Sequence, residues 1–355
     1  MRRKANFEIL RIISMGMIVT LHYFSHGGGY TQIAHGSFAY YIMQSIIAMA
    51  QVGVDCFVLI SSYFMIDKTF SLSRIINTFA NTIFYSILGL SVFVAFSTES
   101  IGLKDIVYSL FPVTSSQYWF ITQYVLLLFF SPLINKALIN MTEDTLKKIT
   151  VIFVILFSII PTVLPWSRYY ISSGKNISWF VTLYLVAACL KKIKMENRCK
   201  HCLRVFFIIS FFVAVVDDKL VLLMNALGNN LSTVLYYNNS PNVLICAILL
   251  MMWANKMNVE SKLSDSIVNF GGKVFGVYLF HDNPLIRTLL WNQIGKLFIY
   301  GEWGFVLNLP ISLLLIFLIG LFIETIRKKI FNCLKIDTGI KYLSNYFTTK
   351  LQLET

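Results

Sequence analysis

FEILRIISMGMIVTLHYFSHG, residues 7–27, decides the fold, because it is apolar over the length of a membrane-spanning helix and still carries Arg11 and His22. Eleven residues at about 100° each bring both side chains to within about 20° of one helix face, about 16 Å apart along the axis. Ionisable groups are costly in hydrocarbon and usually serve a function there. We therefore expect this face to hold an anion near Arg11 and to support proton chemistry at His22.

The rest of the sequence has the composition of a membrane protein. Of its 355 residues, 57% are hydrophobic and 13% are charged, which is about half the charged fraction of a soluble domain. The net charge of +13 lies in short segments between apolar runs. This distribution is typical of residues that set membrane topology and attract anionic lipids, and it argues against a nucleic-acid partner. The basic start precedes no small-residue cleavage site, so we expect a retained first helix.

The apolar segments predict an all-α, polytopic membrane helix bundle with about ten transmembrane helices. Of the 30 lysines and arginines, 24 fall on the side of the N-terminus, so we expect both termini in the cytoplasm. One transmembrane domain would span residues 1–335 and a short polar cytoplasmic tail residues 336–355, and the short apolar piece at 106–113 would be interfacial or re-entrant. The run at 203–224 could end early, at the charges of residues 217–219. The predicted helices cover residues 7–27, 40–66, 75–97, 117–138, 149–166, 177–193, 203–224, 240–257, 267–288 and 304–326.

His22 and Asp55 are the candidate catalytic residues inside the membrane. An imidazole accepts and returns a proton near neutral pH, which suits a general base or a nucleophile, although a packed histidine bonded to a neighbouring helix is the alternative. His26 lies one turn further on and could be an ordinary interfacial residue. Asp55 stands in the middle of the second helix and needs a partner, for which His22 is the candidate. A purely structural hydrogen bond is an equal alternative for Asp55.

Arg11 and Arg74 are the candidate anion-binding residues. Arg74 follows the second predicted helix on the cytoplasmic side, so it would end near the same membrane plane as Arg11. Two fixed guanidinium groups suit a phosphate. Glu8 precedes Arg11 by three residues and would pair with its guanidinium. Ordinary topology-setting or lipid-binding arginines are the alternative.

Polar and aromatic side chains at outer helix ends form a candidate acceptor site. Tyr118 and Trp119 open the fourth helix, and His281 lies near the outer end of the ninth, one turn after Tyr278. Such a cluster could bind a hydroxylated acceptor, whereas an aromatic belt would explain Tyr118 and Trp119 equally well. No metal is expected, because Cys199 and Cys202 resemble only half of a zinc site. The six cysteines suggest no disulfide framework.

Five motifs follow one another in the order of a known family. Glu8, Arg11 and His22 give an acidic-x-x-Arg start and an Arg-x10-His signature; the other four are residues 54–63 (VDCFVLISSY), Arg74 with its thin basic stretch, 118–120 (YWF) followed by 131–133 (SPL), and 275–281 (FGVYLFH). In this order they resemble the membrane acyltransferase-3 family, the integral-membrane O-acyltransferases of bacterial surface polysaccharides. The chain departs from the family pattern at Ser62, where the family has glycine.

The resemblance implies a ten-helix acyltransferase domain over residues 1–335 in a bacterial cell membrane. It implies an O-acetyltransferase that moves an acyl group from cytoplasmic acyl-CoA, with acetyl-CoA as the expected donor, to a hydroxyl of a surface or exported polysaccharide or a lipid-linked glycan. The residues implied are Arg11 and Arg74 with Glu8 for acyl-CoA, His22 and Asp55 for catalysis, and His281, Trp119 and Tyr118 for the acceptor.

Other functions remain open from the sequence alone. Buried arginine, histidine and aspartate also suit a proton-coupled transporter or flippase for a sugar or lipid-linked glycan, although the chain shows no convincing repeated halves. A structural scaffold for a polysaccharide assembly complex is a third reading, and it would predict tolerance of substitutions at Arg11 and His22. Succinyl is an alternative to acetyl as the transferred acyl group. No sequence pattern indicates the glycan acceptor or the oligomeric state.

Overall fold

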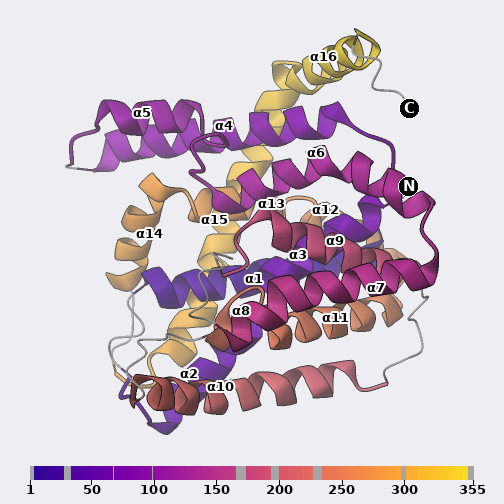
Figure 1. The fold of residues 1–355 in the computed structure, drawn as a ribbon. Helices are drawn as coiled ribbons and strands as arrows, with labels where there is room; N and C mark the ends of the chain where they lie inside the picture. Colours follow the sequence, from indigo (N-terminus) through magenta and orange to yellow (C-terminus); the bar gives the residue numbers. More distant parts are fainter. Residues whose placement is uncertain are drawn as a thin grey trace.

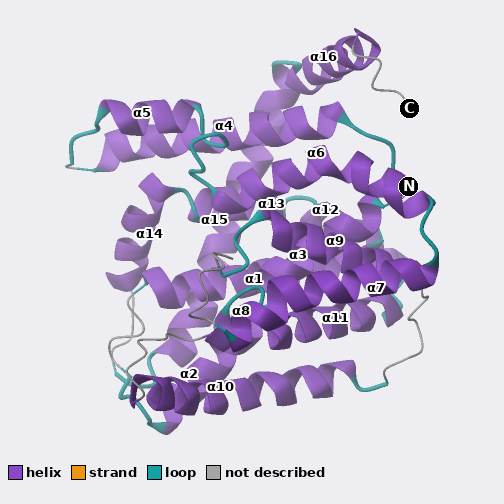
Figure 2. Ribbon diagram, in the orientation of Figure 1, coloured by secondary structure: helices purple, strands orange, loops and turns teal. Residues whose placement is uncertain are grey.

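The computed structural model is a bundle of helices in the residues that it describes, which are 4–27, 33–66, 68–97, 99–164, 173–192, 200–226, 234–296 and 301–350 (Figure 1). Within these ranges Figure 2 shows helices and loops and no strand. The all-α membrane bundle expected from the sequence is therefore confirmed in its class. The count of ten spans and the side of the two termini stay predictions.

The helix bounds agree with the apolar segments at most positions. The first half of the chain forms α1 (Ala5–His26), α2 (Phe38–Ala50), α3 (Gly53–Met65), α4 (Leu72–Phe96), α5 (Leu103–Leu110), α6 (Trp119–Ile139), α7 (Glu143–Val154), the π-helix η1 (Ile155–Ile159) and α8 (Ile160–Val163). The second half forms α9 (Ile177–Lys192), α10 (Cys202–Ala226), the short 3₁₀ helix η3 (Val234–Tyr236), α11 (Pro241–Lys256), α12 (Ser261–Gly271), α13 (Val274–His281), α14 (Pro284–Lys296), α15 (Phe305–Cys333) and α16 (Ile336–Lys350).

Six stretches of the described chain are long and apolar enough to cross a membrane. They are α1, the joined pair α2 and α3, α4, α6, the run from α7 to α8, and α15. Helix α11 is apolar but shorter, with 16 residues. Of the other predicted spans, α9 has 16 residues, α10 is long but carries the charges of residues 217–219, and 267–288 is divided, so ten crossings are not established.

Helix α1 lies in the middle of the bundle and positions the site. It packs against α2, α3, α11, α12, α13 and α15 (Figure 1). Phe7, Leu10 and Val19 on this helix are at most 1% exposed. A helix enclosed in this way keeps Arg11 and His22 inside protein instead of lipid, which lowers the cost of placing ionisable groups at membrane depth.

The predicted helix 40–66 is divided into α2 and α3 at Gln51 and Val52. Gly53 opens α3 against α1, where an added Cβ would come within 2.8 Å of the backbone oxygen of Ser14. The Gln51 side chain donates from Nε2 to Asn238 Oδ1 at 2.6 Å. The turn therefore lets α3 approach α1 closely where no side chain intervenes.

The predicted helix 267–288 is wrong as one element, because the chain forms α12, α13 and α14 there. Gly271 and Gly272 separate α12 from α13, and glycine disfavours helix continuation. Asn283 separates α13 from α14: its Oδ1 accepts from the backbone N–H groups of Leu285 and Ile286 at 2.9 and 3.2 Å. Asparagine as an N-cap followed by Pro284 is a favoured helix start.

Helix α10 continues through residues 217–219, where the sequence suggested an end. Asp217 Oδ1 accepts from the backbone N–H of Leu235 at 3.2 Å. Asp218 accepts from the Tyr41 hydroxyl at 3.1 Å and pairs with His35 Nε2 at 3.0 Å. Both carboxylates therefore have partners on other elements, so the helix need not end at them.

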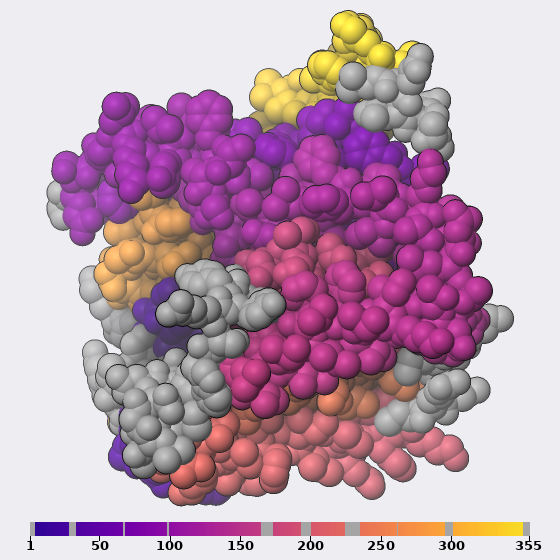
Figure 3. Space-filling model, in the orientation of Figure 1, coloured from indigo at the N-terminus to yellow at the C-terminus, as the bar shows by residue number. Residues whose placement is uncertain are grey.

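The C-terminal segment forms a helix of its own. Helix α15 runs to Cys333, beyond the predicted end at residue 326. Helix α16 then occupies most of the predicted polar tail, packs on α4 and projects from the bundle in yellow in Figures 1 and 3.

Candidate functional site

A cavity of about 570 Å³ lies where the beginnings of α1 and α4 meet the end of α15. We call it the basic cavity, because Arg11, Arg74, Arg327 and Lys328 line it. The structure thus brings together the two arginines that the sequence suggested for an anion. The lining also has six serine, threonine and asparagine side chains: Ser61, Ser71, Ser73, Asn77, Thr78 and Asn81.

Arg11 is held by a carboxylate from its own helix. Its Nη1 forms an ion pair with Glu8 Oε1, as the spacing predicted. Glu8 is buried against Gly271, where an added Cβ would come within 2.8 Å of the Cβ of Glu8. The break between α12 and α13 is therefore also the place where Glu8 is accommodated, and Glu8 in turn fixes the guanidinium at the cavity wall.

Arg74 stands in the first turn of α4, with Ser71 just before the helix. The first backbone N–H groups of a helix have no partner within the helix, and the helix dipole favours anions at this end. Ser71, Ser73 and Arg74 all line the basic cavity. The beginning of α4 therefore adds to the positive potential of the arginines.

Arg327 on α15 is a cavity residue that we did not single out from the sequence. Its Nε and Nη2 donate to Glu324 Oε2 and Oε1 at 2.9 and 2.7 Å, and the Tyr85 hydroxyl donates to Glu324 Oε2 at 2.9 Å. The guanidinium lies 4.6 Å from the centre of the Phe331 ring. The sequence did hold a signal, since Glu324 and Arg327 have the same spacing as Glu8 and Arg11.

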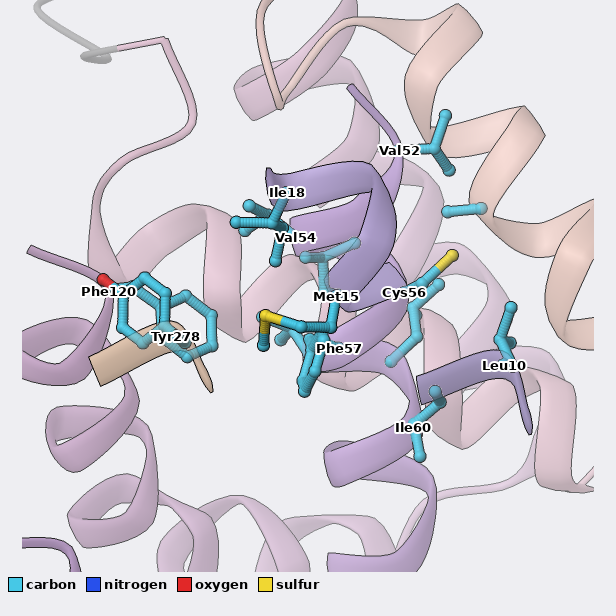
Figure 4. Packing of buried hydrophobic residues seen from close by; sticks show 14 of the residues in the cluster. Leu10, Met15, Ile18, Val52, Val54, Cys56, Phe57, Ile60, Phe120 and Tyr278 are labelled. Atoms are coloured by element: carbon cyan, nitrogen blue, oxygen red, sulfur yellow. The ribbon is translucent and has the colours of Figure 1, made fainter. Parts of the chain in front are cut away.

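A narrow apolar space of about 30 Å³, which we call the neck, lies beyond the basic cavity. Phe57, Phe120 and Phe275 line both of them. His22 and Asp282 lie at the far side of the neck. Figure 4 shows side chains of the neck gathered from α1, α3, α6 and α13: Met15, Ile18, Val54, Phe57, Phe120 and Tyr278.

A second cavity of about 480 Å³ opens at the C-terminal end of α1. We call it the histidine cavity, because His22 and His26 line it. It shares His22, Trp119 and Asp282 with the neck. Its other polar lining residues are Ser25, Gln51, Lys175, Asn238 and Arg287. His22 therefore stands between a basic cavity, reached through the neck, and a second polar cavity.

A chain of hydrogen bonds fixes the proton positions on His22. His281 Nδ1 lies 2.7 Å from the backbone oxygen of Val277, which can only accept, so this nitrogen carries hydrogen. In neutral His281 the other nitrogen, Nε2, is then an acceptor, and it lies 2.9 Å from His22 Nδ1. His22 therefore donates from Nδ1 and keeps its lone pair on Nε2.

Asp282 is the carboxylate nearest to His22 among the described residues. Its Oδ1 lies 3.7 Å from His22 Nδ1 and 2.9 Å from Arg287 Nη2. Arg287 also donates from Nη2 to the backbone oxygen of Asp282 at 3.1 Å. A positive charge formed on His22 would therefore lie beside a carboxylate whose position is fixed by Arg287. Arg287 is a site residue that we did not single out from the sequence.

The expected pairing of Asp55 with His22 is wrong. Asp55 is fully buried, and its Oδ1 accepts from Trp179 Nε1 at 3.1 Å. Its Oδ2 has no hydrogen-bond partner among the described residues. Asp55 lies in the packing between α3 and α9 and lines neither cavity nor the neck. The alternative that the sequence left open, a structural hydrogen bond, describes this contact.

Of the three residues expected to bind the acceptor, Trp119 lines a cavity, whereas Tyr118 and His281 are buried. Trp119 lines the neck and the histidine cavity, with Lys175 Nζ 5.5 Å from its ring centre. Tyr118 is fully buried; its hydroxyl donates to the backbone oxygen of Leu279 at 3.0 Å and accepts from Asn283 Nδ2 at 2.8 Å. Tyr118 therefore holds α13 to α6. His281 is also buried, and it contacts His22.

His22, His26 and Asp282 could hold a metal ion by distance alone, since one ligand atom from each lies within 4.8 Å of the others. Arg287 already pairs with Asp282 at 2.9 Å, however, and its positive charge disfavours a divalent cation at the same carboxylate. We assign no metal to this site. Cys199, one of the two cysteines that resemble half of a zinc site, lies outside the described residues.

A membrane helix bundle with an oriented imidazole between a basic cavity and a second polar cavity has the parts of an integral-membrane transferase. Residues 4–325 match the family model described as an acyltransferase domain, so the chain belongs to the acyltransferase-3 family and is a membrane acyltransferase. Comparisons with curated proteins and with solved structures gave no match.

Proposed function

We propose that this protein is an O-acetyltransferase of a bacterial cell membrane. It takes an acyl group from cytoplasmic acyl-CoA, with acetyl-CoA as the donor, and transfers it to a hydroxyl of a surface or exported polysaccharide or a lipid-linked glycan. The observation that carries the proposal is the placement of His22, which lines the neck on the side away from the four cations of the basic cavity.

The phosphates of the donor bind in the basic cavity, at Arg11 and Arg74. Charge-assisted hydrogen bonds from guanidinium groups to phosphate are strong and directional. The pantetheine arm passes the phenylalanines of the neck and brings the thioester to His22. Arg11 and His22 are about 16 Å apart along α1, a distance that an extended arm of this kind can cover.

The glycan hydroxyl approaches His22 from the histidine cavity. His22 Nε2 accepts the hydroxyl proton while the oxygen attacks the thioester carbonyl, so an O–C bond forms and the C–S bond breaks. The proton returns from the imidazolium to the departing thiolate, which leaves as free coenzyme A. Asp282 stabilises the transient imidazolium across 3.7 Å, and Trp119 packs on the sugar ring in the same cavity.

The test is acyl transfer by purified protein in lipid nanodiscs, with acetyl-CoA labelled in the acetyl group and a membrane extract as the source of acceptor. His22→Ala should abolish label transfer at unchanged protein abundance, since it removes the imidazole that accepts the hydroxyl proton. His35→Ala is the matched control, because His35 pairs with Asp218 and lies outside both cavities.

Full label transfer by His22→Ala would refute the catalytic role. Uptake of a glycan by wild-type proteoliposomes without consumption of acetyl-CoA would instead favour the proton-coupled transporter or flippase.

A further inference from the structure

Two acid–arginine pairs, from different helices, present guanidinium groups to the basic cavity. Glu8 holds Arg11 on α1, and Glu324 holds Arg327 on α15. The cavity is also lined by Arg74 and Lys328, so its lining has four basic side chains and one carboxylate, Glu324. The positive potential of these side chains favours an anionic ligand in the cavity.

Arg327 is held by more contacts than a simple ion pair with Glu324. Glu324 accepts from both Arg327 and Tyr85, and all three side chains are buried. Gly276 leaves the space, since an added Cβ would come within 2.6 Å of Glu324 Oε2. The bonds to Glu324 use two of the five guanidinium N–H donors, and Arg327 still lines the cavity.

The basic side chains of the cavity can be assigned to the phosphates of a nucleotide donor. Each phosphate of its diphosphate bridge has one ester and one anhydride bond and carries one negative charge, so Arg11 and Arg74 offer one guanidinium group to each. A phosphomonoester carries close to two negative charges at neutral pH. Arg327 and Lys328 are two adjacent cations on one helix turn, and both line the cavity.

We infer that Arg327 and Lys328 bind the phosphomonoester on the ribose of the acyl donor, and so select coenzyme A over donors that lack this group. The inference rests on the proposed function, because it assumes that acyl-CoA occupies the basic cavity. Both residues lie beyond residue 325, where the match to the family ends.

The test is direct binding of two ligands, coenzyme A and 3′-dephospho-coenzyme A, to full-length protein in nanodiscs by calorimetry. Wild-type protein should bind coenzyme A about tenfold or more tightly than the dephospho form, which is the effect of one charge-assisted contact. Arg327→Gln should reduce this ratio to near one and leave the affinity for the dephospho form within about twofold. Lys328→Gln should reduce the ratio in the same direction.

The matched control is Lys329→Gln, which removes the same charge from an exposed neighbour that does not line the cavity and should keep the full ratio. Arg327→Gln leaves Glu324 buried without its cation and can fail to fold. The double variant Glu324→Gln, Arg327→Gln keeps an acceptor for Tyr85 without a buried charge, and it should show the same loss of preference.

The outcomes separate the two proposals. Wild-type protein that binds neither ligand would remove the proposed function together with this inference. Wild-type protein that binds both ligands equally, or an Arg327 variant that keeps the full preference for coenzyme A, would overturn only the assignment of the phosphomonoester.

Discussion

At the scale of single residues, His281 decides which nitrogen of His22 is basic. Replacing His281 with alanine removes the acceptor for His22 Nδ1, so the ring can rotate and change tautomer. We expect His281→Ala to lower kcat about 100-fold, within the usual contribution of an oriented base, and to leave the KM for acyl-CoA unchanged, because the phosphates bind elsewhere. Initial rates at varied acetyl-CoA measure both constants.

The conservative variant His281→Gln separates positioning from packing. A glutamine oxygen can accept from His22 Nδ1, so part of the lost kcat should return, whereas a purely structural defect would not be relieved in this way. Wild-type kcat in the alanine variant would show that His281 does not orient the base.

Spacing along one helix predicted more of the site than side-chain chemistry did. Arg11 and His22 lie where the period of the first helix placed them, and Glu8 pairs with Arg11 as three-residue spacing predicts. The partner of Asp55 could not be predicted, because Trp179 reaches it from another helix. Tyr118 resembled an interfacial aromatic residue, yet packing with α13 buries it.

At the scale of elements, replacing a glycine with alanine should change the stability in opposite directions in α13 and in α1. Gly276→Ala would place a Cβ against Tyr85 and Glu324 in a filled interior, so it should lower the stability by about 1–3 kcal/mol. Gly16→Ala meets no atom within 4 Å and should raise the stability by about 0.5–1 kcal/mol through helix propensity. Thermal unfolding of both variants in nanodiscs, each compared with wild type, measures the difference.

An equal shift of unfolding temperature in the two variants would contradict the packing of α13 against α4 and α15.

The breaks before and after α13 are not visible in the mean hydropathy of the segment. Residues 267–288 are apolar enough to resemble one span, and only the residues at the two breaks indicate three helices. Gly271 and Gly272 mark one break, and Asn283 before Pro284 marks the other. These breaks place Glu8 at one end of α13 and His281 at the other.

At the scale of the whole molecule, the two cavities should open to opposite sides of the membrane. The bias of positive charge toward the N-terminal side predicts that the basic cavity faces the cytoplasm and the histidine cavity the outside. The structure brings each set of residues to its own end of α1, as this orientation requires.

Cysteine labelling tests this orientation. In a cysteine-free background that retains acyl transfer, Ser73→Cys in the basic cavity should react with a membrane-impermeant maleimide only in inside-out vesicles. Ser25→Cys in the histidine cavity should react only in right-side-out vesicles. Coenzyme A should protect Ser73→Cys and leave Ser25→Cys reactive, because the neck separates the two positions. Labelling of both from one side would mean that the acyl group does not cross the membrane inside this protein.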